Sequence, residues 1–202
     1  TILDRVTGVQ TCALPILNPN ALYPDHPLFD EVTVRDAGGG ITTAPAYGKQ
    51  YPHARYACIN HPTYRKFLRD VLTEVFSQYA PDGLYVDGLT PHVCFCRFCK
   101  AKYLELFRAE MPVEKLSKIP ASWAVWGEFG GDPQPVGDVE NDIDARRLTN
   151  LLYNSLVEVT REFTVTVKKH QPAAITAYHS HPKQGLQESY DATLTEVYSP
   201  RP

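Results

Sequence analysis

The sequence predicts an α/β fold in which helices pack against a parallel β-sheet. Apolar residues recur with a helical period over residues 62–79, and a short apolar run bounded by glycines follows at 83–88. A longer helical pattern over about 142–169 then leads into a strand-like run at 174–178. Alternation of helices and strands along a chain is typical of a parallel sheet covered by helices.

The first predicted helix spans residues 62–79. Pro62 suits the first turn of a helix, and Asn60 or His61 stands at the capping position. Pro81 and Gly83 end the pattern. The apolar residues that recur at helical spacing are Tyr64, Phe67, Leu68, Val71, Leu72, Val75, Phe76 and Tyr79.

The later elements follow in order. The run from Gly83 to Gly88 predicts a buried strand, and a second helix is expected over about 97–110. The third helix, over about 142–169, ends before Pro172. Two strand-like runs follow, at 174–178 and at 193–198.

Two long segments lack any period, residues 17–57 and 112–141, and we expect both to be loops. The alternation of elements alone does not separate an open doubly wound sheet from a (β/α)8 barrel. Long loops after strands favour the barrel, because its βα loops build the functional site.

The first residues resemble a translated sequencing adapter rather than a natural protein sequence. The run Val6–Ile16 (VTGVQTCALPI) has no hydrophobic period and no helix caps, although an ordinary N-terminal strand and loop is the alternative. We therefore set residues 1–16 aside, with Cys12, and treat 17–202 as one partial domain. Both ends look cut, so the sequence does not assign a cellular compartment.

Composition argues against two classes of partner. The chain is 43% hydrophobic and 21% charged, with a formal net charge of −3. This charge does not suggest a nucleic-acid or membrane partner, and no apolar run is long enough to span a bilayer. Any homo-oligomer would depend on the whole parent protein.

Four cysteines predict a structural zinc site. Cys94, Cys96 and Cys99 lie within six residues, and Cys58 lies upstream. Zinc takes four thiolates in a tetrahedron, and a closed site of this kind pins loops without performing chemistry. It would tie Cys58, ahead of the first helix, to the loop after the strand at 83–88.

Other interpretations of the cysteines remain open. They could form a disulfide, or they could be buried free thiols. His61 or His92 could replace Cys58 as a ligand if Cys58 lies too far away. A thiolate zinc site favours a reducing compartment slightly.

The motifs around these cysteines resemble two groups of barrel glycoside hydrolases. Residues 79–88 (YAPDGLYVDG) resemble the fourth barrel strand of the alpha-L-fucosidase-like group. The Cys-x-Cys-x-x-Cys cluster with an upstream cysteine resembles the zinc site of beta-galactosidases that carry a trimerisation domain. The resemblance covers residues 56–107 and implies the middle of a (β/α)8 barrel, from just past the third strand to near the sixth.

The resemblance also implies a carbohydrate substrate and a pair of catalytic carboxylates. Asp87 is the first candidate, because barrel enzymes place catalytic groups at the carboxyl ends of strands. In the fucosidase-like group an Asp at this position is the nucleophile. The beta-galactosidase group instead has an Asn-Glu pair here, from which Val86-Asp87 departs. The alternative is that Asp87 caps a turn with Gly88.

The partner carboxylate could be Glu128 or Glu196, although for each glutamate alone a solvated surface group is the commoner interpretation, because charged residues mostly face water. Trp123 and Trp126 lie shortly before Glu128 and could stack on a sugar ring or pin their loop to the barrel.

Two histidines favour a second hypothesis. His179 and His181 follow a predicted strand, where alternate residues point the same way and could bind sugar hydroxyls. With Asp87 they could instead bind a catalytic metal, as in a barrel hydrolase of amidohydrolase type. A catalytically inactive barrel that binds carbohydrate is a third reading.

Overall fold

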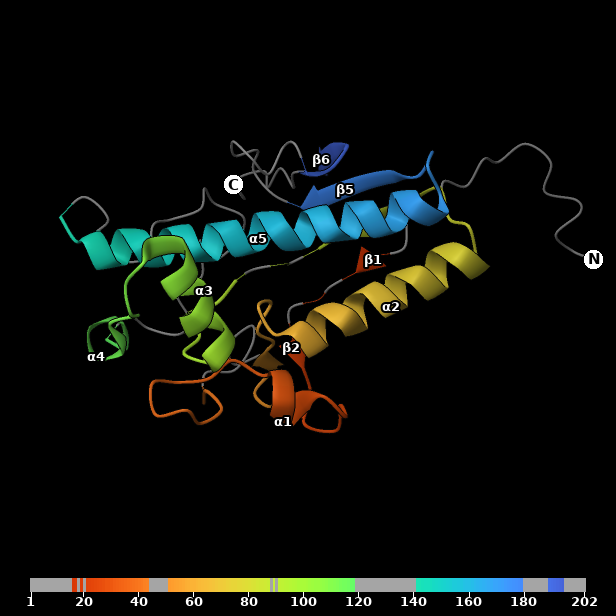
Figure 1. Cartoon of the computed structure of the whole chain (residues 1–202). Helices are drawn as coiled ribbons and strands as arrows, with labels where there is room; N and C mark the ends of the chain where they lie inside the picture. The colour runs from red at the N-terminus through yellow and green to blue at the C-terminus, as the bar shows by residue number, and fades with distance from the viewer. Residues whose placement is uncertain are drawn as a thin grey trace, which may run out of the picture.

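Helices cover one face of a parallel sheet in a computed structural model of the chain (Figure 1). The structure describes residues 16–17, 19, 21–43, 51–87, 89, 91–118, 141–179 and 189–194. Within these ranges the parallel strands are β1 (Ile16–Leu17), β4 (Gly83–Val86), β5 (Ile175–His179) and β6 (Ala192–Leu194). The helices are α1 (Phe29–Val32), α2 (Pro62–Gln78), α3 (Arg97–Phe107), α4 (Val113–Leu116) and α5 (Ile143–His170). A small antiparallel pair joins β2 (Ala21–Leu22) to β3 (Arg55–Tyr56).

The strands of the parallel sheet follow the order of the chain. The spatial order is β1-β4-β5-β6, and each neighbouring pair is parallel. A doubly wound sheet needs a point where the strand order reverses, and the described strands contain no such reversal. Right-handed crossovers between strands in this order place the connecting helices on the same face. The described part of the sheet is therefore singly wound.

The alternation of side chains along β4 and β5 separates two faces. Leu84, Val86 and Tyr178 belong to the main buried core, together with apolar residues of α2 and α5. Thr176 pairs with Leu84 and shares its face of the sheet. Ile175 is the neighbour of Thr176 in β5, so its side chain points to the opposite face. Its exposed fraction is 49%, so this face of the sheet is incompletely covered at Ile175.

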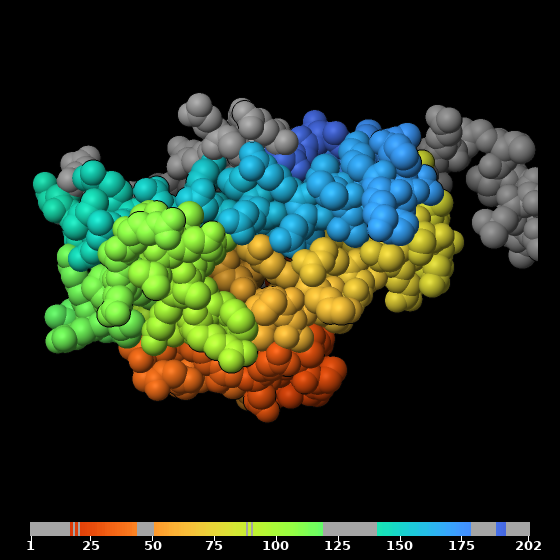
Figure 2. All heavy atoms as spheres, viewed as in Figure 1, coloured from red at the N-terminus to blue at the C-terminus, as the bar shows by residue number. Residues whose placement is uncertain are grey.

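The two long helices pack along each other over the covered face. Figure 2 shows α5 lying against α2 and α3 on one side of the molecule. In α2, the buried residues recur at intervals of four: Tyr64, Leu68, Leu72 and Phe76. Asp142 caps α5 by accepting hydrogen bonds from the backbone N–H groups of Asp144 and Ala145. No helix in the described part of the chain is both long and apolar enough to cross a membrane.

A second buried cluster joins α3 to the N-terminal half of α5. It contains Tyr103 of α3 and Leu148, Leu151 and Leu152 of α5, all at most 1% exposed. The same cluster includes the cysteines Cys58, Cys94 and Cys99. Its other members include Val34, Val93, Phe95, Met111 and Leu116. The region around the cysteines is thus built into the core.

Most predicted elements are confirmed. The helices expected over 62–79, 97–110 and 142–169 are α2, α3 and α5, and the strands expected at 83–88 and 174–178 are β4 and β5. The last strand begins at Ala192 and is described as far as Leu194.

The expectation of uninterrupted loops was wrong in two places. Residues 17–57 contain β2, α1 and β3, and residues 112–141 contain α4. Each of these elements has only two to four residues, which is too short for a hydrophobic period to reveal. Ile16, the last residue of the segment set aside above, pairs with Tyr85 in the sheet.

A matched pair of valines tests the packing of α5. Val159 is fully buried and Val165 is 68% exposed on the same helix. We expect Val159→Ala to lower the free energy of unfolding by about 2 kcal/mol, because it leaves a cavity under the helix. Val165→Ala should change it by less than about 0.5 kcal/mol. Urea denaturation of both variants measures the difference, and equal losses would contradict the assigned burial.

Candidate metal centre and the carboxyl edge of the sheet

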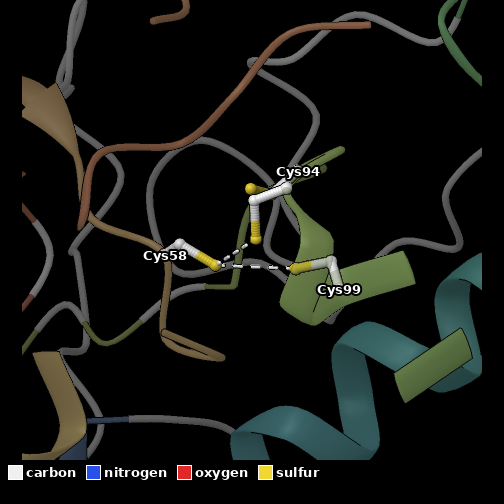
Figure 3. Close-up of side chains that lie close together, drawn as sticks. Cys58, Cys94 and Cys99 are labelled. Carbon is white, nitrogen blue, oxygen red and sulfur yellow. Dashed lines mark hydrogen bonds between the residues drawn. The ribbon is translucent and has the colours of Figure 1, made fainter. Parts of the chain in front are cut away.

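Three separate parts of the chain bring four cysteines together. Cys58 lies in the loop before α2, Cys94 and Cys96 follow β4, and Cys99 lies in the first turn of α3. The four Sγ atoms all lie within 4.8 Å of one another. The Cys58 Sγ lies 3.7 Å from that of Cys96 and 3.5 Å from that of Cys99. Figure 3 shows the side chains of Cys58, Cys94 and Cys99 close together.

These separations fit a tetrahedral metal site. With metal–sulfur bonds of about 2.3 Å, the edges of a tetrahedron are about 3.8 Å long. A disulfide needs a separation of about 2.05 Å, and the four cysteines are free thiols in the structure. Four sulfurs that close a tetrahedron leave no open position for a substrate, so such a site would be structural.

The two histidines considered as substitute ligands are not needed, because Cys58 itself reaches the cluster. His92 stacks on Tyr56 with ring centroids 3.4 Å apart. His61 meets the ring of Phe98 edge-on at 4.5 Å. Both histidines are buried.

The four sulfurs are not electrostatically equivalent. Hydrogen bonds with Cys58, Cys94 and Cys99 lower the pKa of Cys96 far below that of an ordinary thiol. Hydrogen bonding with Cys94 and with the other two cysteines, together with burial, raises the pKa of Cys58. One thiolate is thus stabilised by its neighbours, while like-charge repulsion opposes further ionisation. A bound divalent cation would remove that repulsion and favour four thiolates.

Groups around the cluster donate hydrogen bonds to its sulfurs. The Arg35 backbone N–H donates to the Cys94 Sγ at 3.3 Å, and the Asn60 Nδ2 donates to the Cys99 Sγ at 3.5 Å. Cys96 occupies the N-cap of α3, where the helix dipole favours a negative charge. Each of these contacts places a hydrogen-bond donor or a helix N-terminus next to a sulfur of the cluster.

The predicted cap at Asn60 or His61 was correct in position but not in mechanism. His61 is the N-cap of α2, and its side chain makes no capping hydrogen bond. The Asn60 amide faces Cys99 instead. Sequence reasoning missed Asn60 and Arg35 as neighbours of the cluster. The only local signal was the position of Asn60 two residues after Cys58.

Asp87 lies at the carboxyl edge of the sheet, directly after β4. Its backbone N–H donates to the Leu17 carbonyl of β1 at 2.8 Å, so the position is held by the sheet. Since Val86 pairs with Tyr178, the register places Asp87 beside His179. Burial, then the charges of Tyr190 and Asp87, raise the pKa of Tyr178. The half-buried Asp87 carboxylate is therefore close enough to influence this phenol.

The segment between Asp87 and the cysteines is anchored to the neighbouring strand. The Tyr178 hydroxyl donates a hydrogen bond to the Leu89 carbonyl, and Leu89 is fully buried. Val93, just before Cys94, is buried in the second core cluster. The segment with Cys94, Cys96 and Cys99 is thus held near the end of the sheet that carries Asp87.

The structure places some of the predicted site residues and not others. Asp87 and the four cysteines are described, and His179 is described only as the last residue of β5. Five other predicted residues lie outside the described ranges: Trp123, Trp126, Glu128, His181 and Glu196. The second carboxylate and the aromatic contacts stay predictions.

Comparison of the sequence with known proteins gives no match. No protein-family model matches the chain, and no curated protein matches it by sequence.

Comparison of the fold does give matches among solved structures. A beta-galactosidase from the Antarctic haloarchaeon Halorubrum lacusprofundi matches over 92% of this chain, with a TM-score of 0.56 and 18% identity. Alpha-L-fucosidase isoenzyme 2 from Paenibacillus thiaminolyticus matches over 87%, with a TM-score of 0.53 and 15% identity. A beta-galactosidase from Bacillus circulans sp. alkalophilus matches over 84%, with a TM-score of 0.51 and 16% identity.

The matched region is only part of each of these enzymes. The chain covers 30% of the Halorubrum protein, 22% of the Paenibacillus protein and 27% of the Bacillus protein. The three belong to the two classes of glycoside hydrolase that the motifs around the cysteines resemble. At this level of identity the likeness establishes a shared fold, so the chain has the fold of a segment of such enzymes.

Proposed function

We propose that this chain is the middle part of a (β/α)8-barrel glycoside hydrolase, with a structural zinc site beside the carboxyl ends of its strands. The singly wound sheet that delivers Asp87 to its carboxyl edge carries this proposal. A barrel continues the same strand order around a closed circle, with every helix on the outside.

The face of the sheet opposite α2 and α5 carries an exposed apolar residue, Ile175, which supports closure into a barrel. In a closed barrel this face points inward and is filled by side chains from the other strands. Ile175, at 49% exposure, is an apolar residue that gains from such burial. The helix-covered face is already buried, since Leu84 is 1% and Val86 is 4% exposed.

The proposed reaction is hydrolysis of a glycosidic bond by two carboxylates. Asp87 acts as the nucleophile, and Glu128 or Glu196 acts as the acid and base. Carboxyl groups about 5–5.5 Å apart would give retention of the anomeric configuration, and about 6.5–9.5 Å would give inversion. Asp87 suits the role because it sits directly after a barrel strand, next to His179.

The remaining predicted contacts would bind the sugar. Trp123 and Trp126 would stack on the apolar face of the pyranose, and His179 and His181 would hydrogen-bond its hydroxyls. The carbohydrate is therefore the expected partner of this site.

The cysteine cluster would contribute stability rather than chemistry. Zinc fits four sulfurs at these separations, and Cys58, Cys94, Cys96 and Cys99 would hold it. It would fasten the loop before α2 to the start of α3, next to the edge that carries Asp87.

Replacement of Asp87 tests the enzymatic proposal. In the protein that carries this chain, Asp87→Asn should lower turnover of 4-nitrophenyl glycosides by ~10³-fold or more, because the amide is a poor nucleophile. The far-ultraviolet circular dichroism should stay unchanged. Asp70→Asn, on the surface of α2 beside Lys66, is the matched control and should retain full turnover.

Several outcomes would reject this assignment. Full turnover by Asp87→Asn would remove Asp87 from the mechanism. Sugar binding without turnover in the parent would favour an inactive barrel. Loss of a second metal ion on combined His179→Ala and His181→Ala substitution would favour the amidohydrolase hypothesis.

Metal analysis tests the zinc site independently of activity. We expect about one zinc ion per chain, and Cys99→Ala should remove most of it, because three sulfurs no longer close the tetrahedron. Cys12→Ala, the same substitution at the cysteine set aside above, should leave zinc content unchanged. Elemental analysis by mass spectrometry measures both, and zinc retained in Cys99→Ala would contradict the proposal.

Zinc affinity should rise with pH. Hydrogen bonding with Cys94 and burial raise the pKa of Cys58, so this thiol keeps its proton at neutral pH until the metal binds. Hydrogen bonds from the other cysteines lower the pKa of Cys96, so Cys96 contributes less to this release than Cys58. Calorimetric titration with zinc in buffers of different ionisation enthalpy should therefore reveal net proton release. Binding without proton release would show that the thiols are not the ligands.

A further inference from the structure

Four thiolates around Zn²⁺ carry a net charge of about −2 in a buried site, which is costly unless nearby donors and cations compensate for it. Cys58, Cys94 and Cys99 are each 2% exposed, so water stabilises little of this charge. The described donors to the sulfurs are therefore the groups that decide how well the site holds its metal.

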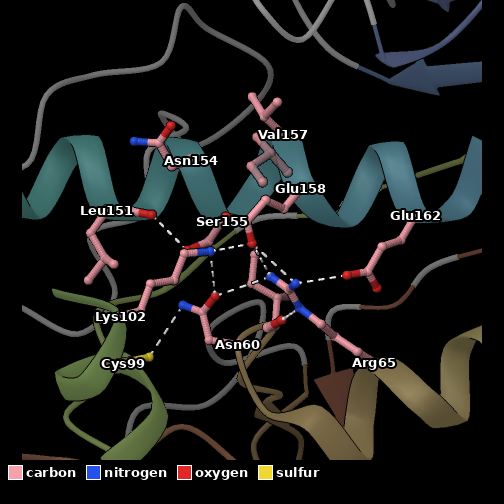
Figure 4. Close-up of polar contacts among 12 residues, drawn as sticks. Asn60, Arg65, Cys99, Lys102, Leu151, Asn154, Ser155, Val157, Glu158 and Glu162 are labelled. Carbon is pink, nitrogen blue, oxygen red and sulfur yellow. Dashed lines mark hydrogen bonds and ion pairs between the residues drawn. The ribbon is translucent and has the colours of Figure 1, made fainter. Parts of the chain in front are cut away.

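One of these donors, Asn60, belongs to a larger polar network. Figure 4 shows Asn60 between Cys99 on one side and Lys102 and Arg65 on the other. The Asn60 Nδ2 donates to the Cys99 Sγ at 3.5 Å. Its Oδ1 accepts from the Arg65 Nη2 at 3.3 Å and from the Lys102 Nζ at 3.4 Å.

The orientation of the Asn60 amide is fixed by charge. Two cations face its oxygen, so the reversed orientation would aim the N–H groups of the amide at positively charged donors. The Arg65 Nε also donates to the Ile59 carbonyl at 2.6 Å, which holds the peptide that precedes Asn60. Contacts to the backbone before Asn60 and to its side-chain oxygen together direct the amide N–H toward Cys99.

The two cations are themselves held in place by α5. The side chain of Lys102 is only 13% exposed, and that of Arg65 is only 14% exposed. Glu158 pairs with both of them, and Glu162 pairs with Arg65 at 2.9 Å. Positive charge therefore lies between the sulfur cluster and the carboxylates of α5.

We infer that Asn60 is a positioning residue of the proposed metal site: it donates a hydrogen bond to the Cys99 sulfur and links the site, through Lys102 and Arg65, to the junction of α2, α3 and α5. This inference rests on the proposed zinc site. The cations polarise the amide, which strengthens the hydrogen bond that it donates to sulfur. Partners beyond the ligands of a metal site commonly change metal affinity by 10–100-fold.

Asn60→Asp tests this role sharply. Aspartate keeps the oxygen that accepts from Arg65 and Lys102, so the fold should survive, but it replaces the donor to Cys99 with a second oxygen. We expect the zinc affinity of the full 202-residue chain to fall about 10–100-fold, measured by competition with a chromophoric chelator. Asn154→Asp, on the exposed side of α5, is the matched control and should leave the affinity unchanged.

Two further variants separate positioning from general stability. Asn60→Ala removes the donor without adding charge and should lower the affinity less than Asn60→Asp. Lys102→Met removes one polarising charge and should lower it in the same direction. In the cobalt-substituted protein, the sulfur-to-metal charge-transfer band should shift to longer wavelength in Asn60→Asp, because a thiolate that loses a hydrogen bond is easier to oxidise.

The outcomes distinguish this inference from the zinc proposal. If the unaltered chain binds neither zinc nor cobalt, the zinc proposal fails. If it binds both and Asn60→Asp stays within about twofold with an unchanged cobalt spectrum, zinc stands and the role of Asn60 is refuted.

Discussion

Burial of one face of the parallel sheet under α2 and α5 is the constraint on which the rest of the structure depends. Leu84, Val86 and Tyr178 supply that face from two neighbouring strands, and Phe76 and Phe163 cover it from the two helices. Since the described strands of this sheet are all parallel, their carboxyl ends meet at one edge. Every chemical feature assigned above lies at or beside that edge, which is where a singly wound α/β fold gathers its functional groups.

The region before α2 has little regular structure of its own and needs other fastenings. The strands β2 and β3 have two residues each, and a pair so short is not stable alone. The backbone N–H of Cys58 donates to the Val32 carbonyl, and Arg35 meets the knuckle through Cys94 and Phe95. The cysteine cluster therefore joins this region to α3 at the place where secondary structure contributes least.

The polar network beside the cluster resolves a conflict between burial and charge. A buried group of thiolates favours positive neighbours, yet buried cations also need partners. Lys102 and Arg65 satisfy both demands. On the side of the sulfurs they donate hydrogen bonds to Asn60, and on the side of α5 they form ion pairs, Lys102 with Glu158 and Arg65 with Glu158 and Glu162. The same contacts connect α2, α3 and α5, so the packing of the helices and the environment of the sulfurs are not independent.

The sequence by itself determined the long elements and the candidate ligands. The apolar spacing of Tyr64, Leu68, Leu72 and Phe76 predicted α2, because local periodicity records which face of a helix is buried. The spacing of Cys94, Cys96 and Cys99 predicted a metal knuckle for a similar reason, since the ligands are close in the chain. Only the tertiary structure decided that Cys58 completes the cluster, that the sheet is singly wound, and that Asn60 faces Cys99 rather than capping a helix. These features join residues 15 or more positions apart, or depend on which of two partners an amide meets, and no local pattern encodes such a choice.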